Sequence, residues 1–229
     1  MTVTRARRNL LIAAPFALML STYLVFSATV PRFPGGSMAS YLGNVFYWTF
    51  WCVAFPLWAV GKSGILGAIR GLGNGDRRDR RPGPAEWVAL AVPVLIPLYI
   101  VPLASASGVG LPAVADLGYG VPVWIPVLFA SILNGVLEEI LWRGTYLAAF
   151  PRDRTLGFVF PSVMFGLWHL SPFSFLAGVG VAELAVIAAV GTLFGLCWGG
   201  VAQRTGNIRW SIYSHVLSNI VLLGSIVAA

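Results

Sequence analysis

The sequence predicts an all-α fold, a polytopic bundle of about seven transmembrane helices. Of the 229 residues, 58% are hydrophobic and only 10% are charged, and the mean hydropathy is +0.81. Soluble domains carry about 25% charged residues, and a soluble fold of this length could not bury so much apolar surface. A bilayer solvates apolar side chains, and each helical crossing needs about 20 of them. We therefore expect a single membrane domain over residues 1–229, with no second globular domain.

Seven apolar stretches are the expected spans. They run from about Asn9 to Val30, Val45 to Val60, Trp87 to Ala106, Val121 to Phe150, Leu156 to Leu170, Gly180 to Val201 and Ile208 to Ala228. The first follows three arginines, as a signal peptide would. Its apolar part exceeds the roughly 7–15 residues of a signal sequence, so a retained span is predicted. The fifth is short and is expected to tilt little or to end inside the bundle.

The basic residues between these stretches predict the orientation of the protein in the membrane. If the seven stretches alternate in direction, one side of the membrane receives only Arg32. The opposite side receives Arg5, Arg7, Arg8, Lys62, Arg70, Arg77, Arg78, Arg80, Arg81, Arg152, Arg154, Arg204 and Arg209. Since Lys and Arg accumulate on the cytoplasmic side, we expect a multi-pass cell-membrane protein with a cytoplasmic N-terminus and an outer C-terminus. The net charge of +7 therefore reflects topology, and no nucleic-acid partner is expected.

Two further features concern the connections and the packing of the helices. The segment at about residues 61–86 is rich in Gly and Arg and is predicted to be a basic cytoplasmic loop near anionic lipid headgroups. Gly191, Gly195 and Gly199 recur at four-residue spacing, which places them on one helix stripe and allows close helix packing. Cys52 and Cys197 have no CxxC spacing, so they are expected to be small core residues.

Ionisable residues inside membrane helices are costly and usually mark function. Five lie in or at the ends of the expected spans, and they include both histidines of the chain: Glu138, Glu139, Arg143, His169 and His215. They fall on three separate stretches. Together with Asn219 they supply carboxylates, imidazoles and an amide, which are the groups needed to activate water and to stabilise an oxyanion.

Helix spacing divides the two glutamates into different roles. Glu139 and Arg143 are four residues apart, so they share a helix face and are predicted to form an ion pair. Glu138 is rotated by about 100° from Glu139 and points elsewhere, with Asn134 and Trp142 as its one-turn neighbours. A carboxylate free of the ion pair suits a general base. A purely structural ion pair would explain Glu139 and Arg143 but would leave Glu138 unexplained.

The two histidines are less informative when each is considered alone. A single histidine such as His169 is often an ordinary core residue whose hydrogen bonds are satisfied. His215 and Asn219 are four residues apart, hence on one face, and polar contacts of this kind also serve ordinary helix packing. The combination on three helices favours a functional site.

At these residues the sequence resembles the CPBP family, which comprises CAAX proteases and bacteriocin-processing or self-immunity (Abi) proteins. That family is recognised by the motifs EExxxR, FxxxH and HxxxN on separate membrane helices. The matching residues here are Glu138, Glu139 and Arg143, then Phe165 and His169, then His215 and Asn219. The resemblance covers about residues 121–229, the expected catalytic core. The first three stretches are similar only in being hydrophobic.

The resemblance implies an intramembrane endopeptidase related to the type II CAAX prenyl endopeptidase. It implies that Glu138 is the general base on a water, that His169 holds this water, and that His215 and Asn219 stabilise the oxyanion. Glu139, Arg143 and Phe165 would support the site. The implied partners are membrane lipids and a peptide or protein substrate at the membrane, which in the best-known cases carries a lipid.

The sequence favours a reaction without a metal or other cofactor. Two histidines and a glutamate could bind zinc, and a zinc-dependent version of the same peptidase is the alternative. However, the sequence has no HExxH motif, the two histidines lie on different stretches, and the Asn219 amide is a poor zinc ligand.

Two other functions use the same residue types. A non-catalytic membrane scaffold or immunity protein could keep the fold to bind a partner, although an intact motif set argues against it. A proton-coupled transporter could use buried Glu and His as a relay. Transporters of that kind usually show repeated halves with broken helices, and this sequence has no such repeat.

Overall fold

The computed structural model describes residues 4–32, 37–71, 80–106, 124–175 and 179–228 and shows a helical bundle. Every regular element within those residues is helical, as predicted. The elements are α1 (Arg5–Thr29), a 3-10 turn (Val30–Arg32), α2 (Ser37–Phe46), the π-helical η2 (Tyr47–Ala54), α3 (Phe55–Arg70), α4 (Pro84–Ala106), α5 (Trp124–Glu139), the π-helical η4 (Ile140–Gly144), α6 (Thr145–Ala149), the π-helical η5 (Thr155–Val159), α7 (Phe160–Trp168), α8 (Leu170–Phe173), α9 (Val181–Thr205) and α10 (Arg209–Ala228).

In each of the seven predicted stretches, nearly all described residues lie in helices. Five continuous helical segments are long and apolar enough to cross a membrane: Arg5–Thr29, Leu42–Arg70, Trp124–Ala149, Thr155–Phe173 and Val181–Thr205. The helix over Pro84–Tyr99 is a shorter apolar one, and α10 is the seventh. The fifth predicted stretch is longer than expected, because α8 continues it beyond His169 to Phe173.

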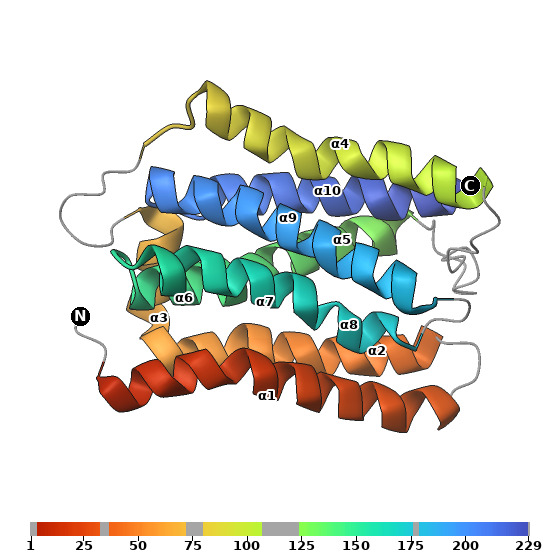
Figure 1. Ribbon diagram of the computed structural model, residues 1–229, viewed down its shortest axis with the longest axis horizontal. Helices are drawn as coiled ribbons and strands as arrows, with labels where there is room; N and C mark the ends of the chain where they lie inside the picture. The colour runs from red at the N-terminus through yellow and green to blue at the C-terminus, as the bar shows by residue number, and fades with distance from the viewer. Residues whose placement is uncertain (1–3, 33–36, 72–79, 107–123, 176–178, 229) are drawn as a thin grey trace.

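The helices lie roughly parallel to one long axis (Figure 1). At one edge of the view α1 lies beside α2 and α3, and at the other edge α4 lies beside α10. α10 packs against α4, α5 and α9, while α7 packs against α9. The segments that carry the three polar motifs therefore meet in the middle of the bundle.

The predicted loop at residues 61–86 is wrong over its first ten residues and its last three, because α4 begins at Pro84. α3 continues to Arg70 and ends at Gly71, with a kink at Gly61, whose φ of 72° favours glycine. Ala68 is buried against Leu147 and Ile208, and the Ala68 carbonyl accepts a hydrogen bond of 3.0 Å from Ile208 N–H. These tertiary contacts keep residues 62–70 helical in spite of their glycines. Residues 72–79, including Arg77 and Arg78, lie outside the described residues.

Hydroxyl groups compensate for prolines inside the helices. Pro15 has no N–H to bond the Leu11 carbonyl, and the Tyr146 hydroxyl donates to that carbonyl at 2.8 Å. The Pro93 carbonyl faces another proline four residues later, and the Ser218 hydroxyl donates to it at 2.6 Å. Because lipid offers no hydrogen bonds, such contacts satisfy the freed backbone groups and also tie distant helices together.

The glycine stripe on α9 lies against α7. Gly195 faces Ser162, and the Ser162 hydroxyl donates to the Gly195 carbonyl at 2.8 Å. A methyl group on Gly195 would lie 2.7 Å from the Ser162 carbonyl oxygen, and one on Gly191 would lie 3.3 Å from His169 Nδ1. The stripe therefore does more than allow close packing, since it sets the position of the helix that ends at His169.

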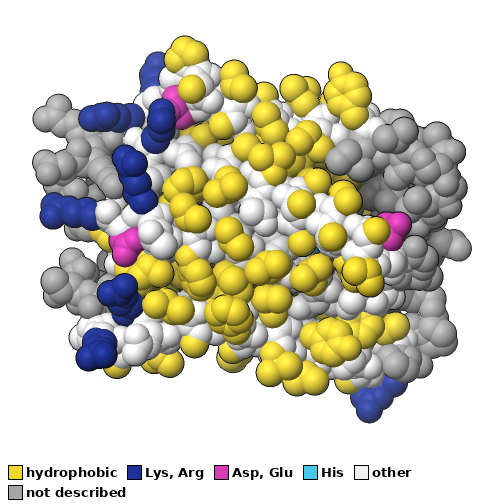
Figure 2. All heavy atoms as spheres, viewed as in Figure 1, with side chains coloured by type: hydrophobic (Ala, Val, Ile, Leu, Met, Phe, Trp, Pro, Cys, Tyr) yellow, Lys and Arg dark blue, Asp and Glu magenta, His cyan; other side chains and the backbone are white. Residues whose placement is uncertain are grey.

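The surface is that of a membrane protein. Figure 2 shows apolar side chains spread over the described part of the face in view, with most basic side chains gathered at one end. Large apolar residues such as Phe16, Trp58, Phe129 and Val186 are more than half exposed. A surface of this kind is stable in lipid and would aggregate in water.

The glycine contact generates the first prediction. Gly195→Ala should lower the free energy of unfolding by about 1–3 kcal/mol, because the new methyl group meets backbone atoms that cannot move aside. Thermal unfolding of the detergent-solubilised protein measures this. Gly200→Ala is the matched control on the same helix, since its methyl group would meet nothing closer than 3.7 Å. Equal stability of the two variants would contradict the analysis.

Candidate active site

The two glutamates lie deep in the bundle, where α5 passes into η4. Glu138 is 2% exposed and Glu139 is fully buried. Both belong to a predominantly apolar helical segment of 26 residues. Since an isolated carboxylate in such surroundings is very costly, the partners of each one are informative.

Glu139 forms the ion pair that the sequence spacing predicts. Arg143 Nη1 lies 2.9 Å from Glu139 Oε1, and both side chains are almost completely buried. The guanidinium also lies 4.5 Å from the ring centre of Phe165 and 5.3 Å from that of Trp198. These cation–π contacts stabilise the charge of Arg143 where water is absent.

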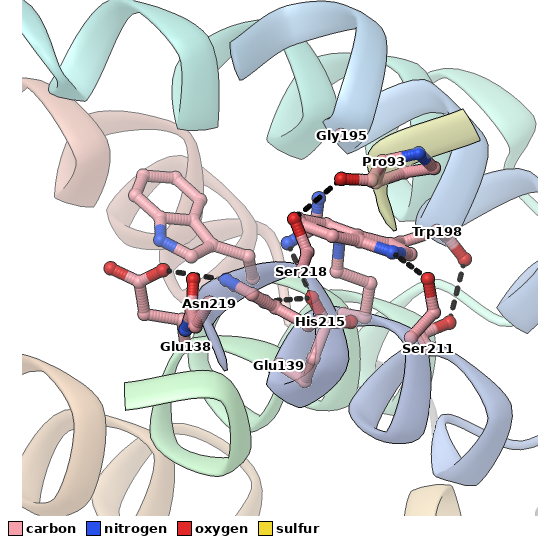
Figure 3. Close-up of polar contacts among 12 residues, drawn as sticks. Pro93, Glu138, Glu139, Gly195, Trp198, Ser211, His215, Ser218 and Asn219 are labelled. Atoms are coloured by element: carbon pink, nitrogen blue, oxygen red, sulfur yellow. Dashed lines mark hydrogen bonds and ion pairs between the residues drawn. The ribbon is translucent and has the colours of Figure 1, made fainter. Parts of the chain in front are cut away.

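His215 lies between the two glutamates (Figure 3). Its Nδ1 is 3.0 Å from Glu139 Oε1, and its Nε2 is 3.4 Å from Glu138 Oε2. The imidazole stacks on Trp198, with ring centres 4.0 Å apart and planes 14° apart. The sequence indicated that His215 belongs to the site, but not that its ring connects both carboxylates.

The contacts of His215 determine where its protons lie. Glu139 Oε1 already accepts from Arg143, so it is a carboxylate oxygen, and His215 Nδ1 is the donor to it. His215 Nε2 and Glu138 Oε2 can bond only if one proton lies between them. With that proton the four groups, Glu138, Glu139, Arg143 and His215, carry no net charge. Burial favours this neutral total.

His169 follows α7 directly and lies against the Phe165 ring. Its Nδ1 is 2.7 Å from the Phe165 carbonyl oxygen. A carbonyl only accepts, so Nδ1 carries the proton and Nε2 is left as an acceptor in the neutral ring. The Phe165 ring centre is 4.7 Å from that of His169 and 6.0 Å from that of His215. Within the described part of the chain, His169 makes no ion pair with either glutamate.

Asn219 lies one helical turn beyond His215 and is half-buried. Its Nδ2 is 3.5 Å from the Ser131 carbonyl oxygen, a distance at the limit of hydrogen bonding. The amide N–H groups are therefore only weakly engaged and remain available to another acceptor.

Sequence reasoning missed a group of residues behind Glu138. The Tyr47 hydroxyl accepts a hydrogen bond of 3.0 Å from Trp142 Nε1, one helical turn after Glu138. Trp48 Nε1 in turn donates to Asn134 Oδ1 at 2.9 Å. Asn134 had a visible signal, because it lies one turn before Glu138. Tyr47 and Trp48 had none, since aromatic residues in an apolar stretch are common in membrane helices.

The site residues do not form a zinc site as they stand. Among the described residues, no three His, Cys, Asp or Glu side chains are grouped so that they could hold one metal ion. Both nitrogens of His215 face carboxylates, and His169 Nδ1 faces a carbonyl. This arrangement leaves His169 Nε2 without the companion ligands that zinc requires.

Comparison with known proteins gives a family match for part of the chain. Residues 120–221 match the family described as type II CAAX prenyl endopeptidase Rce1-like. This match supports the CPBP (CAAX protease) family, which the sequence motifs resemble. The match runs from just before α5 into α10 and contains all three motifs, while α1 to α4 lie outside it. Neither the curated proteins nor the solved structures give a match.

The match supports, at the level of the family, a membrane protease. The buried polar cluster lies inside the matched segment. The site therefore coincides with the part of the chain by which the family is recognised.

The buried ion pair generates the second prediction. Arg143→Ala leaves the Glu139 carboxylate buried without its cation, so the free energy of unfolding should fall by about 3–5 kcal/mol. The matched control is Arg204→Ala, which breaks the ion pair of an exposed arginine with Glu86, also 2.9 Å long. An exposed pair contributes about 0–1 kcal/mol. Thermal unfolding compares the two variants. Similar losses of stability would show that burial does not increase the contribution of the Glu139–Arg143 ion pair.

Proposed function

We propose that the protein is an intramembrane endopeptidase in which Glu138 activates the water that hydrolyses a peptide bond. The observation that supports this most is the buried contact between Glu138 and His215, with Glu139 on the far side of the same ring. Its place inside the segment matched by the CAAX protease family adds support. The substrate would be a membrane-associated or lipid-modified peptide or protein.

Glu138 is better suited than Glu139 to act as the general base. One oxygen of Glu139 binds both Arg143 and His215, so taking up a proton there would weaken two buried interactions. Among the described residues, Glu138 pairs only with His215, with which it shares a proton. A base must be able to exchange protons during turnover, and only Glu138 meets this requirement without loss of the ion pair.

The proposed reaction begins with a water molecule between Glu138 and His169. This water donates one hydrogen bond to His169 Nε2. Glu138 removes a proton from the water, and the water oxygen forms a bond to the carbonyl carbon of the substrate. The carbonyl oxygen becomes an oxyanion, which His215 Nε2–H and Asn219 Nδ2–H stabilise. The carbon–nitrogen bond then breaks, and the proton on Glu138 passes to the leaving amine.

The orientation in the membrane is part of the proposal. Arg5 at the start of α1, Arg70 at the end of α3 and Arg204 near the end of α9 belong to the basic end of the bundle, whereas Arg32 follows the opposite end of α1. By the excess of basic residues, the first end is cytoplasmic. The exposed Ser63 would test this as a Ser63→Cys variant. A thiol reagent that does not cross membranes should fail to label it in intact cells, and efficient labelling would reverse the orientation.

The third prediction tests the base. Glu138→Gln keeps the size of the side chain but cannot accept the proton, so turnover should fall by about 10²–10⁴-fold while the protein still folds. Purified wild-type and variant proteins in lipid vesicles are compared on a farnesylated CAAX peptide and on a pool of membrane peptides, with products identified by mass spectrometry. Glu86→Gln, which alters a carboxylate far from the site, should retain full activity.

Full activity of Glu138→Gln would exclude Glu138 as the base and transfer the role to Glu139. If the wild type cleaves neither the CAAX peptide nor any peptide of the pool, the scaffold function becomes the better explanation. In both cases the ion pair of Glu139 and Arg143 keeps its structural role.

The fourth prediction concerns the proposed metal-free reaction. Since His215 and Asn219 offer oxyanion donors, no Lewis acid is needed, and strong chelators should leave cleavage nearly intact. Asn219→Ala and His215→Ala should each lower the rate by about 10²–10³-fold. A zinc-dependent reaction would instead be lost on chelation and restored by added zinc. It would also depend much more on His215 than on Asn219, because an amide is a weak zinc ligand.

A further inference from the structure

One buried titratable group next to the site has no part in the proposed reaction. Tyr47, the first residue of η2, has no exposed surface. It lies outside residues 120–221 and is 95 residues from Trp142, its hydrogen-bond partner. Burying a hydroxyl in a membrane bundle is costly unless the hydroxyl is hydrogen-bonded, so its partners are informative.

The direction of each hydrogen bond behind Glu138 is fixed by the chemistry of the donors. An indole N–H can only donate. Trp142 Nε1 donates to the Tyr47 oxygen at 3.0 Å, so the single hydroxyl proton of Tyr47 is left for another acceptor. The neighbours of this hydroxyl are the Glu138 carboxylate and the Cys52 thiol, and a carboxylate is a much stronger acceptor than a thiol. In the same way Trp48 Nε1 donates to Asn134 Oδ1, so the Asn134 NH₂ group is left for another acceptor. The two hydrogen bonds therefore leave two donors beside the helix face that carries Asn134, Glu138 and Trp142.

The two residues that bond Tyr47 and Trp48 lie on either side of Glu138 along its helix. Asn134 lies one turn before Glu138 and Trp142 one turn after it, while Tyr47 and Trp48 are neighbours on η2. The ring of Tyr47 also stacks on Trp168, with centres 4.2 Å apart and planes 18° apart. Trp168 precedes His169 and contacts its ring at 4.9 Å between centres. Tyr47 thus contacts groups on both sides of the candidate site.

We infer that Tyr47 is a positioning residue for Glu138: its hydroxyl donates to the carboxylate, holds it in place and stabilises its ionised form. This rests on the proposed function, because it gives Glu138 the role of base. It also assigns the N-terminal half of the chain a direct part in the site, through the helix that contains η2.

The hydrogen bond itself can be tested without turnover. Infrared difference spectra between wild type and Glu138→Gln isolate the bands of the Glu138 carboxyl group in the full-length protein. Tyr47→Phe keeps the ring on Trp168 and removes one donor, so these bands should shift. Tyr146→Phe is the matched control, since it removes an equally buried hydroxyl that donates to the Leu11 carbonyl instead, and it should leave the bands in place.

A second variant keeps the test decisive if Tyr47→Phe does not fold. Trp142→Phe leaves the Tyr47 hydroxyl in place but removes the donor that sets its direction, and it should also shift the Glu138 bands. Unshifted bands in a folded Tyr47→Phe protein, or in Trp142→Phe if the former is unfolded, would overturn the inference.

Kinetics separates positioning from simple stability. On the peptide cleaved in the assays above, Tyr47→Phe should lower kcat about 10-fold or more, the loss expected for one hydrogen bond to a charged group, with KM unchanged. In the Glu138→Gln background the same change should have no further effect, because the two residues act as a unit. Tyr146→Phe should change neither constant.

The outcomes distinguish this inference from the proposed function. If Glu138→Gln keeps its turnover, the proposed function fails, while the infrared bands still decide whether Tyr47 bonds Glu138. If Glu138→Gln is inactive but Tyr47→Phe behaves like Tyr146→Phe in both measurements, the inference fails and the proposed function stands.

Discussion

The buried carboxylate of Glu139 is the constraint on which the rest of the site depends. A single oxygen, Oε1, binds the guanidinium of Arg143 and the imidazole of His215. These contacts join α5 and η4 to α10, and they decide that His215 carries a proton on Nδ1. The other ring nitrogen must then face Glu138. Removing any member would leave a charge in a medium that cannot solvate it, so the cluster holds together as a unit.

Such a cluster requires the helices to approach closely, and lipid supplies no hydrophobic force between them. The bundle instead uses small residues and hydroxyl groups. Gly195 brings α9 against Ser162 of α7, and the hydroxyls of Ser218 and Tyr146 bond backbone carbonyls of α4 and α1. These contacts place Trp198 on α9 beside the ring of His215. The aromatic surroundings of the site are therefore a consequence of the glycine stripe.

Both halves of the chain supply side chains at or near the site, but the C-terminal half supplies most of them. The segment matched by the CAAX protease family holds the carboxylates, both imidazoles and the Asn219 amide. The preceding helices supply Tyr47 and Trp48, which bond Trp142 and Asn134, the residues one turn on either side of Glu138.

The sequence by itself determined the helices and the local pairs. Apolar stretches separated by basic residues predict the bundle, because the bilayer imposes a minimum helix length and rejects charge. Four-residue spacing predicts the pair of Glu139 with Arg143 and the shared face of His215 and Asn219, because one helical turn brings such residues together. Only the tertiary structure decided that residues 62–70 are helical, that His215 connects both glutamates and that Tyr47 lies behind Glu138. These depend on contacts between residues far apart in the chain, and no local periodicity encodes them.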